Sequence, residues 1–234
     1  LKSDRPTLVL LQAGNVNTGH SDPFAAIIER FDPATSWVHV DGAFGLWANA
    51  VPDRRHLLDG VELADSWATD GHKWLNTPYD CGVVAVADPT ALDASMAMNA
   101  AYAGGDGGRS PMNLGLQMSQ GARAIPVWAI LATLGRGGVA DAIERCCRHA
   151  ERMATELAAA GADVLCPPAL NQVLVAFGND DQTDAVVARV QGGGEAWMGG
   201  TNWHGRRAMR ISVSDTSTTE TDIDRAIAAV LAAR

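Results

Sequence analysis

The chain has 234 residues, 47% of them hydrophobic, and carries a formal net charge of −9 at pH 7. This length allows one large domain or two smaller ones with a sizeable core. The negative charge argues against nucleic acid or an anionic membrane as a partner, because neither attracts an acidic protein. No apolar run is long enough to span a bilayer and no signal peptide is recognised, so we expect a cytoplasmic protein.

The first part of the chain alternates between short apolar runs and helical patterns. Asp22 and Pro23 stand at the N-cap and first position of an expected helix at 22–31, and a short helix and turn is expected at 56–64. The alternation predicts right-handed βαβ crossovers in a mainly parallel sheet. Short apolar runs predict strands, the first two of them buried, at 7–14, 36–43, 65–70 and 81–88.

The pattern changes at residues 99–115, a glycine-rich segment with a single tyrosine, which predicts a mobile loop or a lid. We place a domain boundary in the helical patterns that follow. It separates part of a larger sheet domain at 1–135 from a smaller α+β domain at 136–234. The helices expected here are 122–138, 139–161, 182–191 and 216–234, and the strands are 163–166, 171–177 and 208–214.

Cysteines and tryptophans are expected in the core. No cysteine pair has the CxxC spacing, so we predict buried free thiols rather than a disulfide framework or a zinc site, and we expect no bound metal. The cysteines are Cys81, Cys146, Cys147 and Cys166. Three tryptophans that fall in apolar patterns are Trp37, Trp67 and Trp128.

Two polar residues stand where predicted strands end. Asp41 is followed by the small residues Gly42 and Ala43, so its carboxylate either faces a planar ring or caps the next turn. Lys73 is either a solvated turn residue or a partly desolvated amine, which would have a lowered pKa and could form a Schiff base. The carboxyl ends of strands in an α/β sheet line one crevice, so both side chains are expected at one ligand site.

These residues lie in motifs that resemble a known family. HVDGAFG (39–45) and SWATDGHKWLNTPYDCG (66–82) together resemble the pyridoxal-phosphate-dependent group II amino-acid decarboxylases, of the aspartate-aminotransferase fold type I. QAGNVNTGHSDPF (12–24) resembles the family's preceding turn, and GTNWHGRRAMRISVSDTSTTETDID (200–224) its C-terminal strand and helix. The resemblance implies an α/β fold: the C-terminal half of a fold type I large domain, followed by a smaller α+β domain.

The resemblance implies a role for each matching residue toward pyridoxal 5'-phosphate. Lys73 would form the Schiff base with the cofactor. Asp41 would pair with the pyridine nitrogen, which keeps the ring an electron sink. Ala43 would pack against one face of the ring, and His72 would lie near the phosphate or the Schiff base, or only buttress its turn. Asn15 would reach the phenolic oxygen.

Four further residues are candidates by the same resemblance. Asp70, where many relatives carry Asn, would contact the cofactor. Tyr102 matches the single tyrosine of the family's flexible catalytic loop, which favours protonation of the carbanion and excludes water; otherwise it is an ordinary loop aromatic. Arg123 and Arg210 either bind a substrate carboxylate or hold the small domain on the large one, and the structural role is favoured.

The implied activity is decarboxylation of an L-amino acid to an amine and carbon dioxide, in a homodimer. Another fold type I enzyme, an aminotransferase or a carbon–carbon lyase, remains an alternative. So does a truncated, non-catalytic dimerising fragment, because the family's N-terminal part, with its phosphate-gripping loop and ring-stacking histidine, does not precede residue 1. Aromatic, acidic and small amino acids all remain open as substrates.

Overall fold

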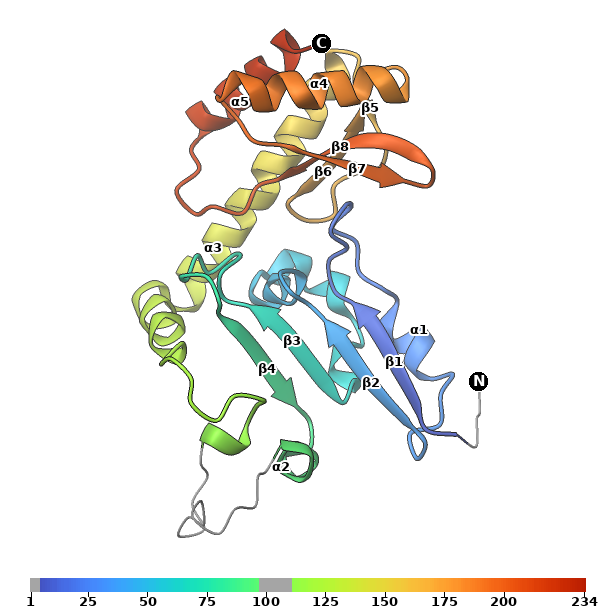
Figure 1. Cartoon of the computed structure of the whole chain (residues 1–234), viewed down its shortest axis with the longest axis vertical. Coiled ribbons are helices and arrows are strands. Elements are labelled where there is room, and N and C mark those ends of the chain that lie inside the picture. Colours follow the sequence, from blue (N-terminus) through green and yellow to red (C-terminus); the bar gives the residue numbers. More distant parts are fainter. Residues whose placement is uncertain (1–4, 97–110) are drawn as a thin grey trace.

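The structure, a computed structural model, describes residues 5–96 and 111–234. It contains two four-stranded sheets, one from the N-terminal and one from the C-terminal part of the chain (Figure 1). The long helix α3 (Ala124–Ala159) runs between them. This mixture of helices and sheets confirms the expected α/β class.

The N-terminal sheet has the order β1-β2-β3-β4. The pairs β1–β2 and β2–β3 are parallel, as predicted, whereas β4 is antiparallel to β3. The reason is the link from β3 to β4, a turn without a crossover helix, which returns the chain in the opposite direction. The strands are β1 (Thr7–Gln12), β2 (Ser36–Asp41), β3 (Ser66–Asp70) and β4 (Gly82–Val86).

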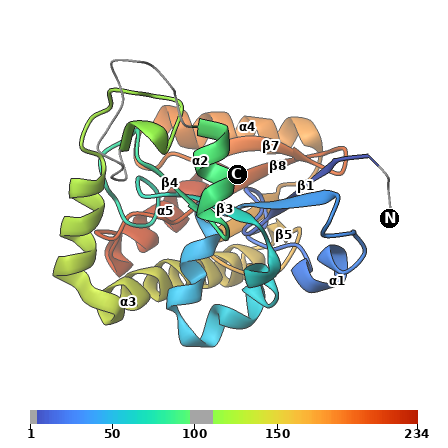
Figure 2. The same cartoon turned by 90° about the horizontal axis from the view of Figure 1, so that it is seen from below.

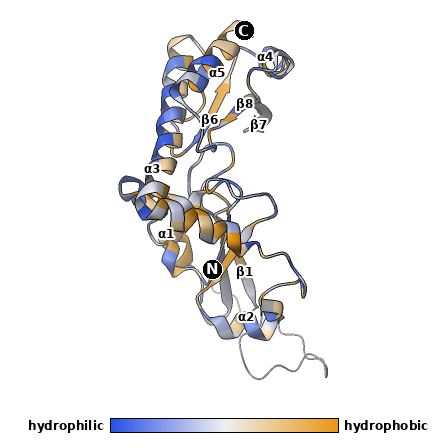
Figure 3. Cartoon of the chain, turned by 90° about the vertical axis from the view of Figure 1, so that its left-hand side faces the viewer, coloured by the Kyte–Doolittle hydropathy of each residue, from blue (hydrophilic) through white to orange (hydrophobic). Residues whose placement is uncertain are grey.

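Within residues 5–96 and 111–234, helical segments cover one face of this sheet. Val9 and Leu11 of β1 are buried, but Leu8 and Leu10, which alternate with them, are 63% and 68% exposed. Figure 2 shows the covering segments on the same side of the sheet, and Figure 3 colours β1 as hydrophobic. The prediction of a buried strand at 7–14 is therefore right for one face and wrong for the other. The covering segments are α1 (Phe24–Ile28) and the 3₁₀ helices η1 (Gly45–Ala50), η2 (Pro52–Leu58) and η3 (Val61–Leu63).

The C-terminal sheet is antiparallel, in the order β5-β6-β8-β7. Its strand β6 is buried along its whole length. Asn179 and Thr219 begin the last two helices with capping boxes, in which the N-cap side chain and the third helical residue bond each other's backbone. The elements are β5 (Asp163–Val164), β6 (Gln172–Ala176), α4 (Asp180–Gly193), β7 (Gly199–Trp203), β8 (Arg206–Ser212) and α5 (Glu220–Ala232).

The segment labelled α3 contains the two helices predicted at 122–138 and 139–161, and they meet at the non-helical residue Gly135 rather than at 138/139. The segment bends at Gly135, whose φ of 61° and ψ of −176° lie in a region that side chains disfavour. The buried residues of α3 all lie beyond this bend, from Val139 onward. One cluster of buried apolar residues includes members from both sheets, so the two halves share a core. The division into domains at 135/136 stays a prediction.

Several local expectations are corrected. Asp22 does not cap α1; its carboxylate accepts a hydrogen bond of 2.7 Å from the backbone of Gln12 and ties the loop to β1. The segment predicted as a helix at 56–64 is 3₁₀ helix, and α1 is shorter than 22–31. Elements that were not predicted are η1, β7, α2 (Pro89–Met96) and η4 (Pro111–Asn113).

The core contains the thiols as predicted. Cys81, Cys146 and Cys147 are buried, Cys166 is partly buried, and all four are free. Trp128 is 70% exposed on α3, so its placement in the core was wrong. Among residues 5–96 and 111–234, no helix is long and apolar enough to cross a membrane. The same residues contain no group of three or more potential metal ligands.

Candidate active site

The candidate site lies at the carboxyl ends of β2 and β3. Asp41 is the last residue of β2 and Asp70 the last of β3. Backbone pairing continues past the β2 end: Gly42 N–H donates to Ala68 O at 2.9 Å, and Asp70 N–H donates to Ala43 O at 2.8 Å. Ala43 therefore lies beside Asp70, and the structure brings the two predicted segments together at one sheet edge.

Glycine allows the chain to pack tightly at this edge. A Cβ atom on Gly45 would lie 2.2 Å from the carbonyl oxygen of Ala13, which follows β1. A Cβ on Gly42 would lie 2.1 Å from Cγ of Leu46. Real Cβ atoms do not come this close to other heavy atoms, so only glycine lets the ends of β1 and β2 meet as they do.

Lys73 follows β3 in the turn that leads to β4. Its Nζ lies 3.1 Å from Oδ2 of Asp70 and 5.9 Å from the ring centroid of Phe44. The side chain is 41% exposed, whereas the next two residues, Trp74 and Leu75, are buried and anchor the turn. The amine is thus reachable from solvent on a fixed backbone. It is one of two lysines in the chain; the other is Lys2.

His72 is held by contacts on three sides. Its Nδ1 lies 3.2 Å from Cys81 O, and because a carbonyl only accepts, that nitrogen carries the proton. Nε2 lies 3.5 Å from Oδ2 of Asp70, so the imidazole and the Lys73 amine share one carboxylate. The ring stacks on Tyr79 with centroids 4.6 Å apart. These contacts agree with a buttressing role for His72.

Asn15 and Asp41 stand at adjoining strand ends. Gln12 pairs with Asp41 in the β1–β2 register, and the amide of Asn15 donates to Oε1 of Gln12 at 2.9 Å. The side-chain oxygen of Asn15, Oδ1, accepts a hydrogen bond from Asn17 N–H in the following turn. Asp41 is exposed, accepts one hydrogen bond, from Ala43 N–H, and forms no ion pair with any residue the structure describes. Its carboxylate is available to a cationic ligand.

The two arginines make contacts between elements. Arg123, at the start of α3, pairs with Asp80 of the β3–β4 turn. Arg210 of β8 reaches Val16 O of the β1–α1 loop at 3.5 Å. Arg123 and Asp80 both lie within 1–135, so their contact does not join the predicted domains. The Arg210 contact links 136–234 to 1–135 and favours the structural role for that residue. Tyr102 lies outside the described residues.

Sequence reasoning did not single out Asn76. Its side-chain amide donates to the carbonyl oxygens of Lys73 and Ser214, at 2.7 and 3.1 Å, and accepts from Thr216 N–H and Oγ–H, both at 2.7 Å. The only local signal was an asparagine in a turn, a residue type that tolerates positive φ. No pattern pairs it with residues near 215, so its role could not be predicted.

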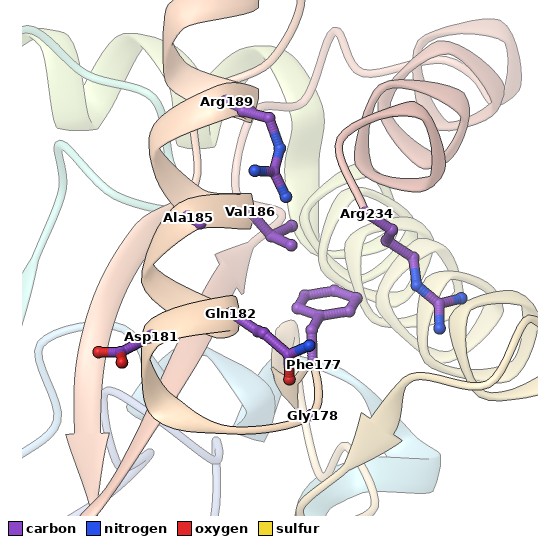
Figure 4. A pocket seen from close by; sticks show the side chains of 8 residues that line it. All are labelled: Phe177, Gly178, Asp181, Gln182, Ala185, Val186, Arg189 and Arg234. Atoms are coloured by element: carbon purple, nitrogen blue, oxygen red, sulfur yellow. The ribbon is translucent and has the colours of Figure 1, made fainter.

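A pocket of about 530 Å³ lies elsewhere, along α4 (Figure 4). Arg189 Nε donates to Ala233 O at 2.6 Å, and the Arg234 guanidinium donates to the carbonyl groups of Ala160 and Gly161. Both arginines of the pocket are therefore bonded to backbone. None of the predicted site residues lines it. The lining residues are Phe177, Gly178, Asp181, Gln182, Ala185, Val186, Arg189 and Arg234.

Known proteins that match this chain belong to the family that its sequence motifs resemble. Residues 2–179 match the family model described as the pyridoxal-dependent decarboxylase conserved domain. Aromatic-L-amino-acid decarboxylase of Drosophila lebanonensis is 30% identical over 165 residues, 68% of this chain and 41% of that protein. 4-Hydroxyphenylacetaldehyde synthase of Rhodiola rosea is 28% identical over 231 residues, 94% of this chain and 47% of that protein.

Solved structures share the fold. Mouse CSAD in apo form superposes with a TM-score of 0.87 at 21% identity, over 97% of this chain and 52% of that one. Oryza sativa TDC with PLP and tryptamine gives 0.84 at 24% identity, over 96% and 50%. These likenesses confirm the expected architecture. The chain spans about a quarter to a half of the length of the curated relatives it matches.

Proposed function

The chain belongs to the pyridoxal-dependent decarboxylase family, and on that premise we propose that it decarboxylates an L-amino acid to its amine and carbon dioxide. Lys73 is the proposed Schiff-base lysine and Asp41 the proposed partner of the pyridine nitrogen. One observation carries the proposal: the Asp41 carboxylate and the Lys73 amine follow neighbouring parallel strands at one sheet edge, and Asp41 is unpaired among the described residues.

The residues at this edge fit pyridoxal 5'-phosphate. An aldehyde needs an accessible amine, and Lys73 is 41% exposed. A protonated pyridine nitrogen needs a carboxylate, and Asp41 is exposed with one neutral donor only. A flat ring needs a small neighbour, and Ala43 lies beside Asp70. When bound, the cofactor supplies an electron sink for the bond broken at Cα.

Each residue then has a defined task. The negative charge of Asp41 would hold a proton on the ring nitrogen of a bound cofactor, because opposite charges at contact distance favour both ionised forms. Asp70 orients Nζ of Lys73 through the 3.1 Å contact and is the nearest carboxylate to a proton leaving that amine. His72 lies beside the same oxygen of Asp70, with Nε2 3.5 Å away. Tyr102 is proposed as the group that protonates Cα, on the family resemblance.

The substrate and assembly are also proposals. Relatives named tyrosine/DOPA decarboxylase, from Papaver somniferum, and tryptophan decarboxylase, from Oryza sativa, make aromatic L-amino acids the first substrates to test. We propose a homodimer in the cytoplasm. The resemblance supports the dimer.

The test supplies the chain with pyridoxal 5'-phosphate and carboxyl-labelled L-tyrosine, L-tryptophan or L-glutamate, and measures labelled carbon dioxide and the organic product. We expect carbon dioxide and an amine from the wild-type chain, and background release from Lys73→Ala. A keto acid without carbon dioxide would identify an aminotransferase instead. No turnover of any substrate would favour the non-catalytic fragment, and an aldehyde would match the relatives named aldehyde synthases.

A further inference from the structure

Asn76 joins the turn of Lys73 to the loop between β8 and α5. Its amide forms four hydrogen bonds: two donated, to Lys73 O and Ser214 O, and two accepted, from the backbone and the hydroxyl of Thr216. An amide has two N–H donors and one carbonyl oxygen with two lone pairs, so these four bonds use its whole capacity. The residue thus links two segments 138 to 140 positions apart in the chain.

The far end of this link is itself fixed. Arg145 of α3 donates to Thr216 O at 2.8 Å, and Cys146 Sγ lies 3.9 Å from Asp215 O. The carboxylate of Asp215 accepts from the backbone and hydroxyl of Ser217, both at 2.7 Å. Because Cys146 is buried in the shared core, the loop is held to the buried part of α3.

The near end acts on Lys73 directly. The Lys73 carbonyl accepts from both the side chain and the backbone N–H of Asn76, at 2.7 and 3.0 Å. Asn76 has a φ of 50°, a left-handed conformation that asparagine and glycine adopt more readily than other residues. The sequence position therefore needs both the backbone preference and the amide of asparagine.

We propose that Asn76 is a positioning residue for Lys73: its amide clamps the lysine turn to the 214–216 loop, so that the amine is already oriented when an aldehyde arrives. This inference rests on the proposed function. A turn without the clamp must be ordered during binding, which weakens the apparent affinity. Because Asn76 is exposed, water takes over most of the bonds of its amide partners, so we expect the net loss to correspond to roughly a tenfold change.

The experiment compares the wild-type chain of 234 residues with Asn76→Gly. Glycine keeps the positive φ, and because Asn76 is exposed, its removal leaves no buried cavity. Asn202→Gly is the matched control: Asn202 accepts a hydrogen bond from Gly205 N–H in the β7–β8 turn. If Asn76→Gly does not fold, Asn76→Asp replaces it, because aspartate keeps the acceptor oxygen but cannot donate to Lys73 O.

Two readouts are measured. The first is amide hydrogen exchange without cofactor, in peptides that cover 70–77 and 212–217. The second is the concentration of pyridoxal 5'-phosphate that half-saturates borohydride-trapped modification of Lys73, mapped by mass spectrometry with Lys2 as internal reference. For Asn76→Gly we expect about tenfold faster exchange at both segments and a roughly tenfold higher half-saturation. Asn76→Asp raises the half-saturation but keeps protection at Thr216. Asn202→Gly changes neither.

The outcomes separate the two proposals. If the wild-type chain labels Lys73 and Asn76→Gly has a half-saturation within twofold of it, the positioning role is wrong and the proposed function stands. Faster exchange without a change in half-saturation leaves Asn76 a structural residue and also overturns the positioning role. If the wild-type chain does not label Lys73, the proposed function fails and the positioning role with it.

Discussion

The charged partners of Asp41 and Lys73 distinguish the two acids of the candidate site. It is exposed at the end of β2, accepts one hydrogen bond from Ala43 N–H, and has no basic partner in the part of the chain that the structure describes. Lys73, by contrast, already has a carboxylate 3.1 Å away, that of Asp70. We therefore propose different roles for the two acids: Asp70 to orient the amine, and Asp41 to pair with the ligand.

Asp41→Asn tests this difference. The amide keeps the size of the side chain but removes the charge that pairs with a protonated ring nitrogen. A charge-assisted hydrogen bond contributes about 1.5–3 kcal/mol, so we expect binding of pyridoxal 5'-phosphate to weaken at least about tenfold in an absorbance titration. Asp93→Asn, an exposed residue of α2, is the control and leaves the affinity unchanged. Equal affinity of Asp41→Asn and the wild-type chain would show that Asp41 does not face the cofactor.

The site residues that could be predicted from the sequence are those that follow a predicted strand. Asp41 and Lys73 each follow a short apolar run, and the geometry of a parallel sheet then places them at one edge. Asn76 could not be predicted, because its partners lie 138 and 140 residues further along the chain and only folding brings them together. The roles of the predicted residues toward the cofactor stay predictions.

Among the elements, α3 contains a break that the sequence predicted. The glycines near 135 predicted two helices, and the structure has two helical halves that meet at the non-helical residue Gly135. A Cβ at this position would meet no other atom within 4 Å, so the need for glycine comes from the backbone alone. The half of α3 before the bend exposes Ile125 and Trp128, whereas the half after it lies in the core.

Two alanine substitutions in α3 distinguish the effect of the bend on stability from that of helix propensity. Gly135→Ala forces a side chain into a disfavoured conformation and should lower the free energy of unfolding by about 1–2 kcal/mol. Gly137→Ala, at an exposed position with helical backbone, should raise it by about 0.5–1 kcal/mol. Urea denaturation measures both. A stabilising Gly135→Ala would mean that the helix is straight in solution.

The spacing of apolar residues predicted some of the other strands and helices but not all of them. The parallel strands and both capped C-terminal helices followed from apolar spacing and N-cap residues. Strand β7, with the sequence GGTNW, has no apolar alternation and was missed; it forms because it pairs with β8 at the sheet edge. An apolar run such as that of β1 is expected whether the strand is buried on one face or on both. The sequence therefore could not predict that one face of β1 is exposed.

The whole molecule has one core that joins the two sheets through α3. Arg54 of η2 marks the junction: its guanidinium contacts Glu144 at 2.7 Å and Glu151 at 2.9 Å on α3, and donates to Ala169 O before β6 at 3.1 Å. Cys147 lies at the same junction. Burial raises the pKa of its thiol to about 12, and burial raises that of Cys146 to about 11.

These thiols predict how stability depends on pH. Below pH 9 they are neutral in both the folded and the unfolded chain, so they contribute no slope. Above pH 9 the unfolded chain loses these protons while the folded chain keeps them up to about pH 11–12. The free energy of unfolding should therefore fall by up to about 1.4 kcal/mol per pH unit for each thiol.

The measurement is urea denaturation between pH 8 and 10.5, and the control is the double variant Cys146→Ala/Cys147→Ala. Because other groups titrate in this range, the comparison rests on the difference between the two curves. We expect a smaller fall with pH in the double variant, although it starts from lower stability. Parallel curves would show that the thiols are not buried in the folded chain.

The most direct test of the account uses the rarity of lysine in this chain. The full chain is incubated with pyridoxal 5'-phosphate, reduced with borohydride and digested, and the pyridoxyl group is located by mass spectrometry at Lys2 or Lys73, the two lysines present. We predict saturable modification of Lys73, weakened by Asp41→Asn, with Lys2 modified only in proportion to reagent concentration. Equal, unsaturable modification of both lysines would contradict the proposed site.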